Sequence, residues 1–294
     1  MAIAGKLIEI DLQVLDGLPP VVSPILPLPQ ALLARGAGEE AFQKSLARHT
    51  EFFPLIVDTH HGNWHRWVIA KYELPSKLIT DFAYVVTTSV ENKIVLVEIE
   101  DPEKPMWVGA AHKPSKSAPF VAALEQVERW RSDLQNPAYR QQVIDDMAAM
   151  MGQSGMLQND WTIEYVLVYG RSAENNSMAR KRMYADLARN SGIKLATYDH
   201  LITANANGQT RIHNVVKMSA GRSFSYAYLN REPNYEFSYL ANGSLLLDAN
   251  AARLFTSYGY NIAAWRNGQS LQVNGKQPLT ALPQIVATVL TSNP

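Results

Sequence analysis

The chain has 294 residues, of which 47% are hydrophobic and 18% are charged, and its 27 lysines and arginines balance its 27 aspartates and glutamates. This composition is that of a globular protein rather than a disordered chain, and the length allows one large domain or two modest ones. The absence of cysteine excludes disulfides, thiolate zinc sites and a cysteine nucleophile, and the zero net charge means that any site for a polyanion must be a local patch.

The N-terminal part begins with an alternating apolar and polar segment over 6–15, which predicts a strand. Five prolines between residues 19 and 29 then predict an extended connector that cannot form a helix. From residue 38 the apolar spacing becomes helical, with Glu39 and Leu46 on one face. No apolar run reaches the roughly 18 residues that span a bilayer. Because Glu9 and Asp11 interrupt the position of a signal peptide, we expect a cytoplasmic protein without a membrane partner.

The central part predicts three strands, over 64–72, 81–88 and 93–100, followed by helices over 117–135 and 137–151. The third strand contains the continuous apolar run Ile94-Val-Leu-Val97, which is typical of a strand buried on both faces of a sheet. Asp101-Pro102 ends this strand, because proline removes a donor from the ladder of hydrogen bonds.

The remaining part predicts a strand over 162–169, a basic helix over 177–191 and a strand over 193–198. Strands joined by a helical crossover pair in parallel, so the sheet is expected to be mixed. Asn-Gly turns that begin at residues 207, 242, 267 and 274, three of them between plausible strands, and helices over 249–258 and 279–291 indicate an appended unit. We therefore predict an α/β (α+β) fold, with a mixed central sheet flanked by helices and a small C-terminal α+β unit.

Three carboxylates stand at the ends of two neighbouring predicted strands, Asp81 on one and Glu98 and Glu100 on the other. Side chains alternate across a strand, so Glu98 and Glu100 share one face. Burying like charges there costs several kcal/mol unless a cation compensates, and Lys93 is the only basic residue between Asp81 and Glu98. Oxygen ligands suit Mg²⁺ or Mn²⁺ better than Zn²⁺. The pattern therefore predicts a divalent metal site.

Short motifs follow these carboxylates along the chain. In order they are Asp81, Glu98-Ile-Glu100, Ala123-Leu-Glu-Gln-Val-Glu-Arg-Trp130, Val166-Leu-Val-Tyr-Gly-Arg171 and Thr197-Tyr-Asp-His-Leu201. Together they resemble the Shedu antiphage-defence nuclease family over roughly residues 38–202. The resemblance implies the PD-(D/E)XK superfamily and a restriction-endonuclease-like domain over 38–204. A strand and proline-rich connector (1–37) would precede this domain, and an accessory α+β unit (205–294) would follow it.

By this resemblance, Asp81 and Glu98 would be the metal-binding carboxylates, and Gln126 would be a helix glutamine that faces the site. A glutamate of the first helix completes the catalytic pattern, and either Glu39 or Glu40 could fill it. We prefer Glu39, because it shares a helix face with the apolar residues.

Glu100 takes the position at which the superfamily usually has a lysine that orients the attacking water. A glutamate there could accept a proton from water or bind a second metal ion. Lys113 or Lys116, from the loop before the Gln126 helix, could fold back to replace the missing cation.

Basic residues in three segments form a candidate phosphate-binding patch. They are Lys113, Lys116, Arg171, Arg180, Lys181 and Arg182. Phosphate contacts need only sequence-independent positive charge. A solvated helix face would explain the run at 180–182 equally well.

Other residues have simpler explanations. Phe120 and Trp130 are expected in the core rather than stacked on bases, and His60, His61 and His65 in a surface loop rather than a metal site. No serine elbow, phosphate loop or dinucleotide fingerprint occurs, so no organic cofactor is expected.

The resemblance thus implies a Mg²⁺- or Mn²⁺-dependent DNA endonuclease of a bacterial antiphage defence system, acting as a homo-oligomer in the cytoplasm. The alternative is a catalytically inactive nucleic-acid-binding or sensing module of the same fold, in which the glutamate at position 100 marks lost chemistry.

Overall fold

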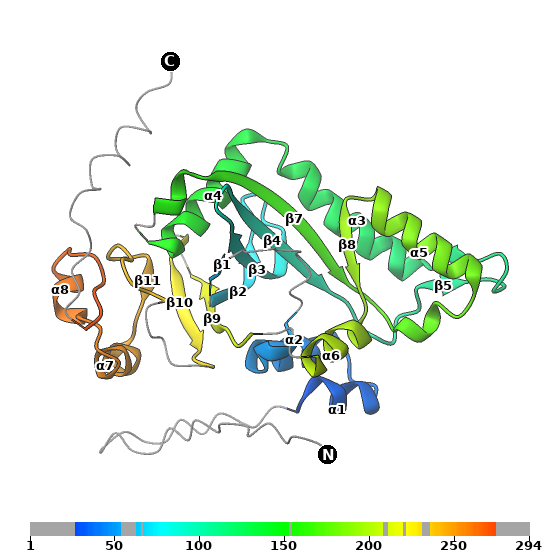
Figure 1. Ribbon diagram of the computed structural model, residues 1–294, viewed down its shortest axis with the longest axis horizontal. Helices are drawn as coiled ribbons and strands as arrows, with labels where there is room; N and C mark the ends of the chain where they lie inside the picture. Colours follow the sequence, from blue (N-terminus) through cyan, green and yellow to red (C-terminus); the bar gives the residue numbers. More distant parts are fainter. Residues whose placement is uncertain are drawn as a thin grey trace.

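The computed structural model describes residues 27–53, 63–65, 67–152, 155–207, 211–219, 222–230 and 236–274. In these ranges the centre of the molecule is a nine-stranded mixed sheet (Figure 1). Its strands are β1 (Asn63–Trp64), β2 (Trp67–Glu73), β3 (Ile79–Thr87), β4 (Glu91–Ile99), β7 (Asp160–Val168), β8 (Ile193–Ala196), β9 (Asn214–Met218), β10 (Phe224–Tyr228) and β11 (Leu245–Leu246). A separate hairpin consists of β5 (Trp107–Val108) and β6 (Ser115–Lys116).

The strands of the central sheet follow the order β11-β10-β9-β2-β3-β4-β7-β8, and β1 pairs with β3. β2, β3 and β4 are antiparallel, whereas β7 pairs in parallel with both β4 and β8. The helical crossover between β7 and β8 accounts for their parallel pairing. The mixed sheet predicted from the sequence is confirmed.

Helices cover both faces of the sheet. α1 (Pro29–Ala34), α2 (Glu39–Arg48) and α6 (Tyr198–Ala206) pack on one face, and α3 (Ala118–Asp133) and α4 (Pro137–Met151) pack on the other. α5 (Met178–Asn190) lies beside β8, and α7 (Ala249–Ser257) and α8 (Ile262–Arg266) lie at the β11 end (Figure 1). Short 3-10 turns cover Thr50–Phe52, Gly155–Gln158 and Ser172–Glu174. In the described parts of the chain, no helix is long and apolar enough to cross a membrane.

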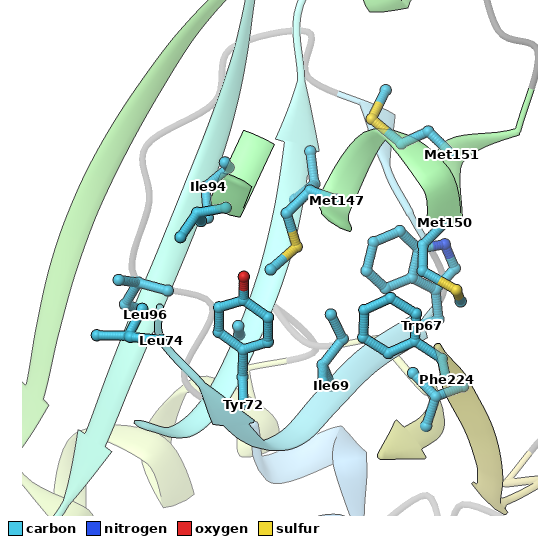
Figure 2. Close-up of a cluster of buried hydrophobic side chains, with 14 of the residues drawn as sticks. Trp67, Ile69, Tyr72, Leu74, Ile94, Leu96, Met147, Met150, Met151 and Phe224 are labelled. Atoms are coloured by element: carbon cyan, nitrogen blue, oxygen red, sulfur yellow. The ribbon is translucent and has the colours of Figure 1, made fainter. Parts of the chain in front are cut away.

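The core has two layers, one on each face of the sheet. Figure 2 shows part of the layer under α4, where Trp67, Ile69 and Tyr72 of β2 lie near Met147 and Met150. The second layer lies under α1, α2 and α6. Because apolar side chains point to both faces, the central strands are the continuous apolar runs that the sequence shows.

Two segments predicted to be extended begin helices instead. Pro29 starts α1 inside the segment predicted to be an extended connector, because the first turn of a helix does not need the N–H that proline lacks. Tyr198 starts α6 rather than ending a strand. Thr197 caps this helix, since its hydroxyl accepts a hydrogen bond from the N–H of His200.

The two Asn-Gly pairs that the structure describes have different roles. Asn242-Gly243 forms a turn before β11, but Asn267-Gly268 ends α8 instead of joining two strands. The glycines of the other two pairs lie outside the described residues, as do the strand predicted over 6–15 and the helix predicted over 279–291. The helix predicted over 249–258 is confirmed as α7.

The sheet continues across residue 204, where the accessory unit was predicted to begin. β9 pairs in parallel with β2, from Trp67 opposite Asn214 to Ala70 opposite Lys217. β10 and β11 extend the sheet further. β2 is therefore an interior strand, held by β3 on one side and β9 on the other.

A buried ion pair ties the segment before β10 to α4. Nε of Arg222 lies 3.1 and 3.0 Å from the two carboxylate oxygens of Asp146, and the hydroxyl of Tyr72 donates to Oδ2 of Asp146 at 2.6 Å. Arg222 also donates to the carbonyl oxygen of Glu73 at 3.3 Å. Because the Asp146 side chain is only 4% exposed, its charge depends on this partner.

We predict that Arg222→Met lowers the free energy of unfolding by about 3 kcal/mol, because the variant leaves the Asp146 carboxylate buried without its cation. Urea unfolding measures the change. Arg253→Met, which alters an exposed helix arginine, is the control and should change stability by less than about 0.5 kcal/mol. An Arg222→Met variant as stable as wild type would show that this ion pair does not hold the segment to α4.

Candidate functional site

Asp81 and Glu98 lie opposite each other at the end of the β3–β4 pair. The last registered pair joins Phe82 to Val97, so the next position joins these two acids. The two acids meet at this end of the sheet, where Asp81 is contacted from α2 and Glu98 from α3. Both acids are buried, at 5% and 6% exposed. The strands thus bring together the two carboxylates that the sequence placed on neighbouring strands.

Asp81 is held by donors from three elements. Its Oδ1 accepts hydrogen bonds from Nε2 of Gln43 on α2 at 2.8 Å and from Nζ of Lys71 on β2 at 2.5 Å. Its Oδ2 accepts one from the backbone N–H of Ile99 at 2.8 Å. Burial raises the pKa of Asp81, and the neighbouring ammonium group of Lys71 acts in the opposite direction.

Glu98 faces α3, from which Gln126 donates a hydrogen bond to Oε1, so this glutamine reaches the site as the resemblance implies. The other oxygen, Oε2, is buried and accepts no hydrogen bond from the described residues. Burial, followed by the negative charges of Asp81 and Glu100, raises the pKa of Glu98 to about 10. A nearby cation would stabilise this carboxylate as an anion.

Glu100 and Glu39 extend the group of acids. Glu100 follows β4 and pairs with Lys104, four residues further on. Glu39, at the start of α2, lies 3.9 Å from the same ammonium group and accepts a hydrogen bond from Gln43 at 2.8 Å. Burial raises the pKa of Glu39, as do the charges of Glu100 and then Asp81. We call Glu39, Asp81, Glu98 and Glu100 the acidic cluster.

Glu40, the other candidate of the first helix, does not belong to the acidic cluster. Its side chain is 80% exposed and pairs with Lys44 at 2.6 Å. The structure therefore agrees with the preference for Glu39 over Glu40 as the residue near Asp81 and Glu98.

The cations at the acidic cluster are Lys71 and Lys104, not Lys113 or Lys116. The two predicted lysines are exposed, and no ion pair in the described parts of the chain joins them to the cluster. A sequence signal for Lys71 did exist. Lys71 and Asp81 are equally far from Ser76, so a hairpin with its turn at Pro75-Ser76 places them opposite each other.

The charges of the acidic cluster fit a divalent cation. With all four side chains ionised, the cluster carries two more negative charges than the ammonium groups of Lys71 and Lys104 offset, and the raised pKa of Glu98 means that this ionised state requires a further cation. Oxygen ligands suit Mg²⁺ or Mn²⁺. However, no three acidic or histidine side chains among the described residues stand as a complete metal-ligand set. The predicted convergence of Asp81, Glu98 and Glu100 into such a set is wrong, because the lysines hold two of the three carboxylates.

Two of the predicted phosphate-binding segments come together at one end of the molecule. Ser177, at the start of α5, donates a hydrogen bond to the carbonyl oxygen of Ala111 in the β5–β6 hairpin at 2.6 Å. This contact joins the hairpin to the helix. We call the exposed basic residues of the two segments the basic surface; they are Lys113, Lys116, Lys181 and Arg182.

Two predicted phosphate-binding arginines have partners inside the protein. Arg171 forms a bidentate pair with Asp199, with its Nη2 2.8 Å from Oδ1 and its Nε 3.1 Å from Oδ2. Arg180 donates to the carbonyl oxygen of Glu174 at 3.2 Å. Either arginine would have to leave or share its partner to bind a phosphate.

Phe120 and Trp130 are fully buried in the core, as predicted. His65 differs from the prediction of a surface loop. It is half-buried, its Nε2 lies 3.1 Å from the hydroxyl of Thr87, and burial lowers its pKa to about 4. His60 and His61 lie outside the described residues.

Comparison with protein-family models matches residues 36–202 to the family described as Shedu protein SduA, C-terminal. The chain belongs to this family. The match spans more than half of the chain and contains the whole acidic cluster, Gln126 and both lysines that contact the cluster. Membership of the Shedu family supports a role in antiphage defence. A comparison with curated proteins found no match.

We predict that Glu98→Gln leaves the fold intact and raises the free energy of unfolding by about 1 kcal/mol in the presence of a metal chelator. Burial and the neighbouring carboxylates raise the pKa of Glu98 to about 10, so at pH 8 folding must protonate a side chain that is ionised in the unfolded chain, and the amide avoids this cost. Urea unfolding at pH 8 measures the effect, and Glu40→Gln is the matched control with no expected change. A Glu98→Gln protein less stable than wild type in the chelator would contradict the claim that burial and neighbouring carboxylates make Glu98 unfavourable in the metal-free protein.

Proposed function

We propose that this Shedu-family protein is a metal-dependent DNA endonuclease with a PD-(D/E)XK type of site. The observation that carries the proposal is the buried pair of Asp81 and Glu98, in which one glutamate oxygen has no hydrogen-bond partner among the described residues. Burying two like charges side by side is unfavourable, and strongly perturbed carboxylates are typical of functional sites.

Glu98 and Asp81 would hold Mg²⁺ or Mn²⁺ through Oε2 and Oδ2. Oδ2 of Asp81 accepts one hydrogen bond, from Ile99, so a lone pair remains for a cation. Such an ion, when bound, polarises the scissile phosphate and lowers the pKa of a bound water. Gln43 and Gln126 hold the other carboxylate oxygens and thereby fix the orientation of both side chains.

Glu100 would accept the proton of the attacking water, in place of the lysine that usually orients this water. Its contact with Lys104 holds the carboxylate at the edge of the acidic cluster, and Glu39 lies beside the same ammonium group. A positioned carboxylate can serve as a general base when it lies within reach of the water proton.

The basic surface would bind the DNA backbone. The loop that follows Glu100 leads directly into the β5–β6 hairpin, so the proposed phosphate contacts and the acidic cluster share one chain segment. Contacts to phosphate need positive charge and no base recognition.

We further propose, from the family resemblance, that the protein acts as a homo-oligomer in the bacterial cytoplasm.

A second candidate function is a catalytically inactive nucleic-acid-binding or sensing module. The ion pairs of Asp81 with Lys71 and of Glu100 with Lys104 favour it, because they neutralise two carboxylates without a metal ion. Calorimetric titration with Mn²⁺ separates the two functions. If the protein is a nuclease, the titration shows a Mn²⁺-binding site that Asp81→Asn and Glu98→Gln abolish. If it is the inactive module, the wild-type protein shows no such Mn²⁺ site.

We predict that the protein cuts DNA with Mg²⁺ or Mn²⁺, and that Asp81→Asn and Glu98→Gln each slow cleavage by about 10³-fold, because each removes a charged group from the reacting centre. The assay compares linear, circular and single-stranded DNA with each ion, alongside protection of cells against phage. Glu40→Gln should behave as wild type. Cleavage that persists in a chelator, or a Glu98→Gln protein that cuts at the wild-type rate, would refute the assignment.

A further inference from the structure

Lys71 lies directly opposite Asp81 in the β2–β3 pair, and its ammonium nitrogen is 2.5 Å from Oδ1 of that aspartate. The flanking pairs in the register are Ala70 with Phe82 and Tyr72 with Thr80. The contact places a cation on one of the two buried carboxylates proposed to hold the metal.

The backbone at Lys71 is in the left-handed region, with φ at +51°. This conformation costs an L-residue about 1 kcal/mol. It also breaks the alternation of the strand, because Ile69 and Tyr72, three residues apart, both face the core under α4 (Figure 2). In a regular strand Lys71 would share the face of Ile69 and enter that core. The left-handed residue keeps the ammonium group out of the core, where it reaches Asp81.

The second cation, Lys104, has a different position. It lies in the turn after β4 and pairs with Glu100 and Glu39. Among the described ion pairs, Lys71 alone contacts Asp81 or Glu98, and its charge opposes the rise in pKa that burial causes in both acids.

We propose that Lys71 is a catalytic lysine of this site, which binds a non-bridging oxygen of the scissile phosphate in place of the lysine that position 100 lacks. This inference rests on the proposed nuclease function. The Lys71 side chain is 52% exposed, so its ammonium group can turn from Asp81 toward a phosphate at the surface of the site. β3 pairs with β2 on both sides of Lys71, and β9 pairs with β2 up to Ala70, so the backbone from which the side chain extends is held within the sheet.

In the hydrolysis, the water oxygen forms a bond to phosphorus while the bond from phosphorus to the leaving sugar oxygen breaks. The proton lost by the water passes to the carboxylate of Glu100, and the leaving oxygen takes up a proton from solvent. Lys71 stays protonated throughout. It stabilises the negative charge on the phosphoryl oxygens in the transition state.

Lys71 and a metal ion would compete for the same carboxylate. Removing the ammonium group should therefore tighten metal binding, because a competitor and a like charge are lost, while cleavage becomes slower. A lysine that only supports the structure would instead weaken both metal binding and cleavage when it is removed. The two measurements together distinguish a catalytic from a structural role.

The test uses the full chain with Lys71→Met, Lys71→Arg and the matched control Lys77→Met. Lys77 lies in the turn between β2 and β3, pairs with Glu73 at the surface and also has a left-handed backbone, with φ at +71°. For each protein, calorimetry measures Mn²⁺ binding, and single-turnover assays measure DNA cleavage at saturating Mn²⁺.

Lys71→Met is expected to bind Mn²⁺ up to about fivefold more tightly and to cut DNA about 10²- to 10³-fold more slowly. Lys71→Arg should recover part of the rate, and Lys77→Met should match wild type. A Lys71→Met protein that cuts at the wild-type rate, or that loses Mn²⁺ binding together with cleavage, overturns this inference alone. Wild-type protein that neither binds Mn²⁺ nor cuts DNA overturns the nuclease function and this inference with it.

Discussion

The buried pair of Asp81 and Glu98 is the constraint around which the described structure is arranged. Neither carboxylate is stable as an anion at this depth without donors for its oxygens. Gln43 of α2, Lys71 of β2 and Gln126 of α3 supply three of these donors. Helices from opposite faces of the sheet therefore meet at one end of two strands. One oxygen of Glu98 still has no hydrogen-bond partner among the described residues, and the proposed divalent cation would contact it.

β2 connects this end of the sheet to the residues beyond 205. It carries Lys71, and it pairs with β3 on one side and with β9 on the other. Arg222 contacts the hydroxyl of Tyr72 and the carbonyl oxygen of Glu73, the two residues that follow Lys71. The segment beyond 205 thus supports the strand from which the lysine extends, although it contributes no residue to the acidic cluster.

The sequence predicted that Asp81 and Glu98 lie at the ends of neighbouring strands, because strand periodicity and the order of short motifs depend on local residues alone, but it did not predict the ion pairs that keep Asp81, Glu98 and Glu100 from forming one ligand set. Gln126 and Glu39 were also placed correctly beside them. Lys71 could not be found from alternation, since its left-handed backbone breaks the period of the strand. The sequence also did not predict that the central sheet continues beyond residue 204, for a different reason. Pairing of β9 with β2 joins segments about 150 residues apart, and composition carries no signal for such a contact.

The proposed nuclease requires a cation at the buried carboxylates, and anomalous diffraction from crystals grown with Mn²⁺ tests this directly. We expect an anomalous peak coordinated by carboxylate oxygens of both Glu98 and Asp81, with the ammonium group of Lys71 moved away from Oδ1 of Asp81. The absence of a peak at this pair at saturating Mn²⁺, with the contact between Lys71 and Asp81 unchanged, would contradict the account.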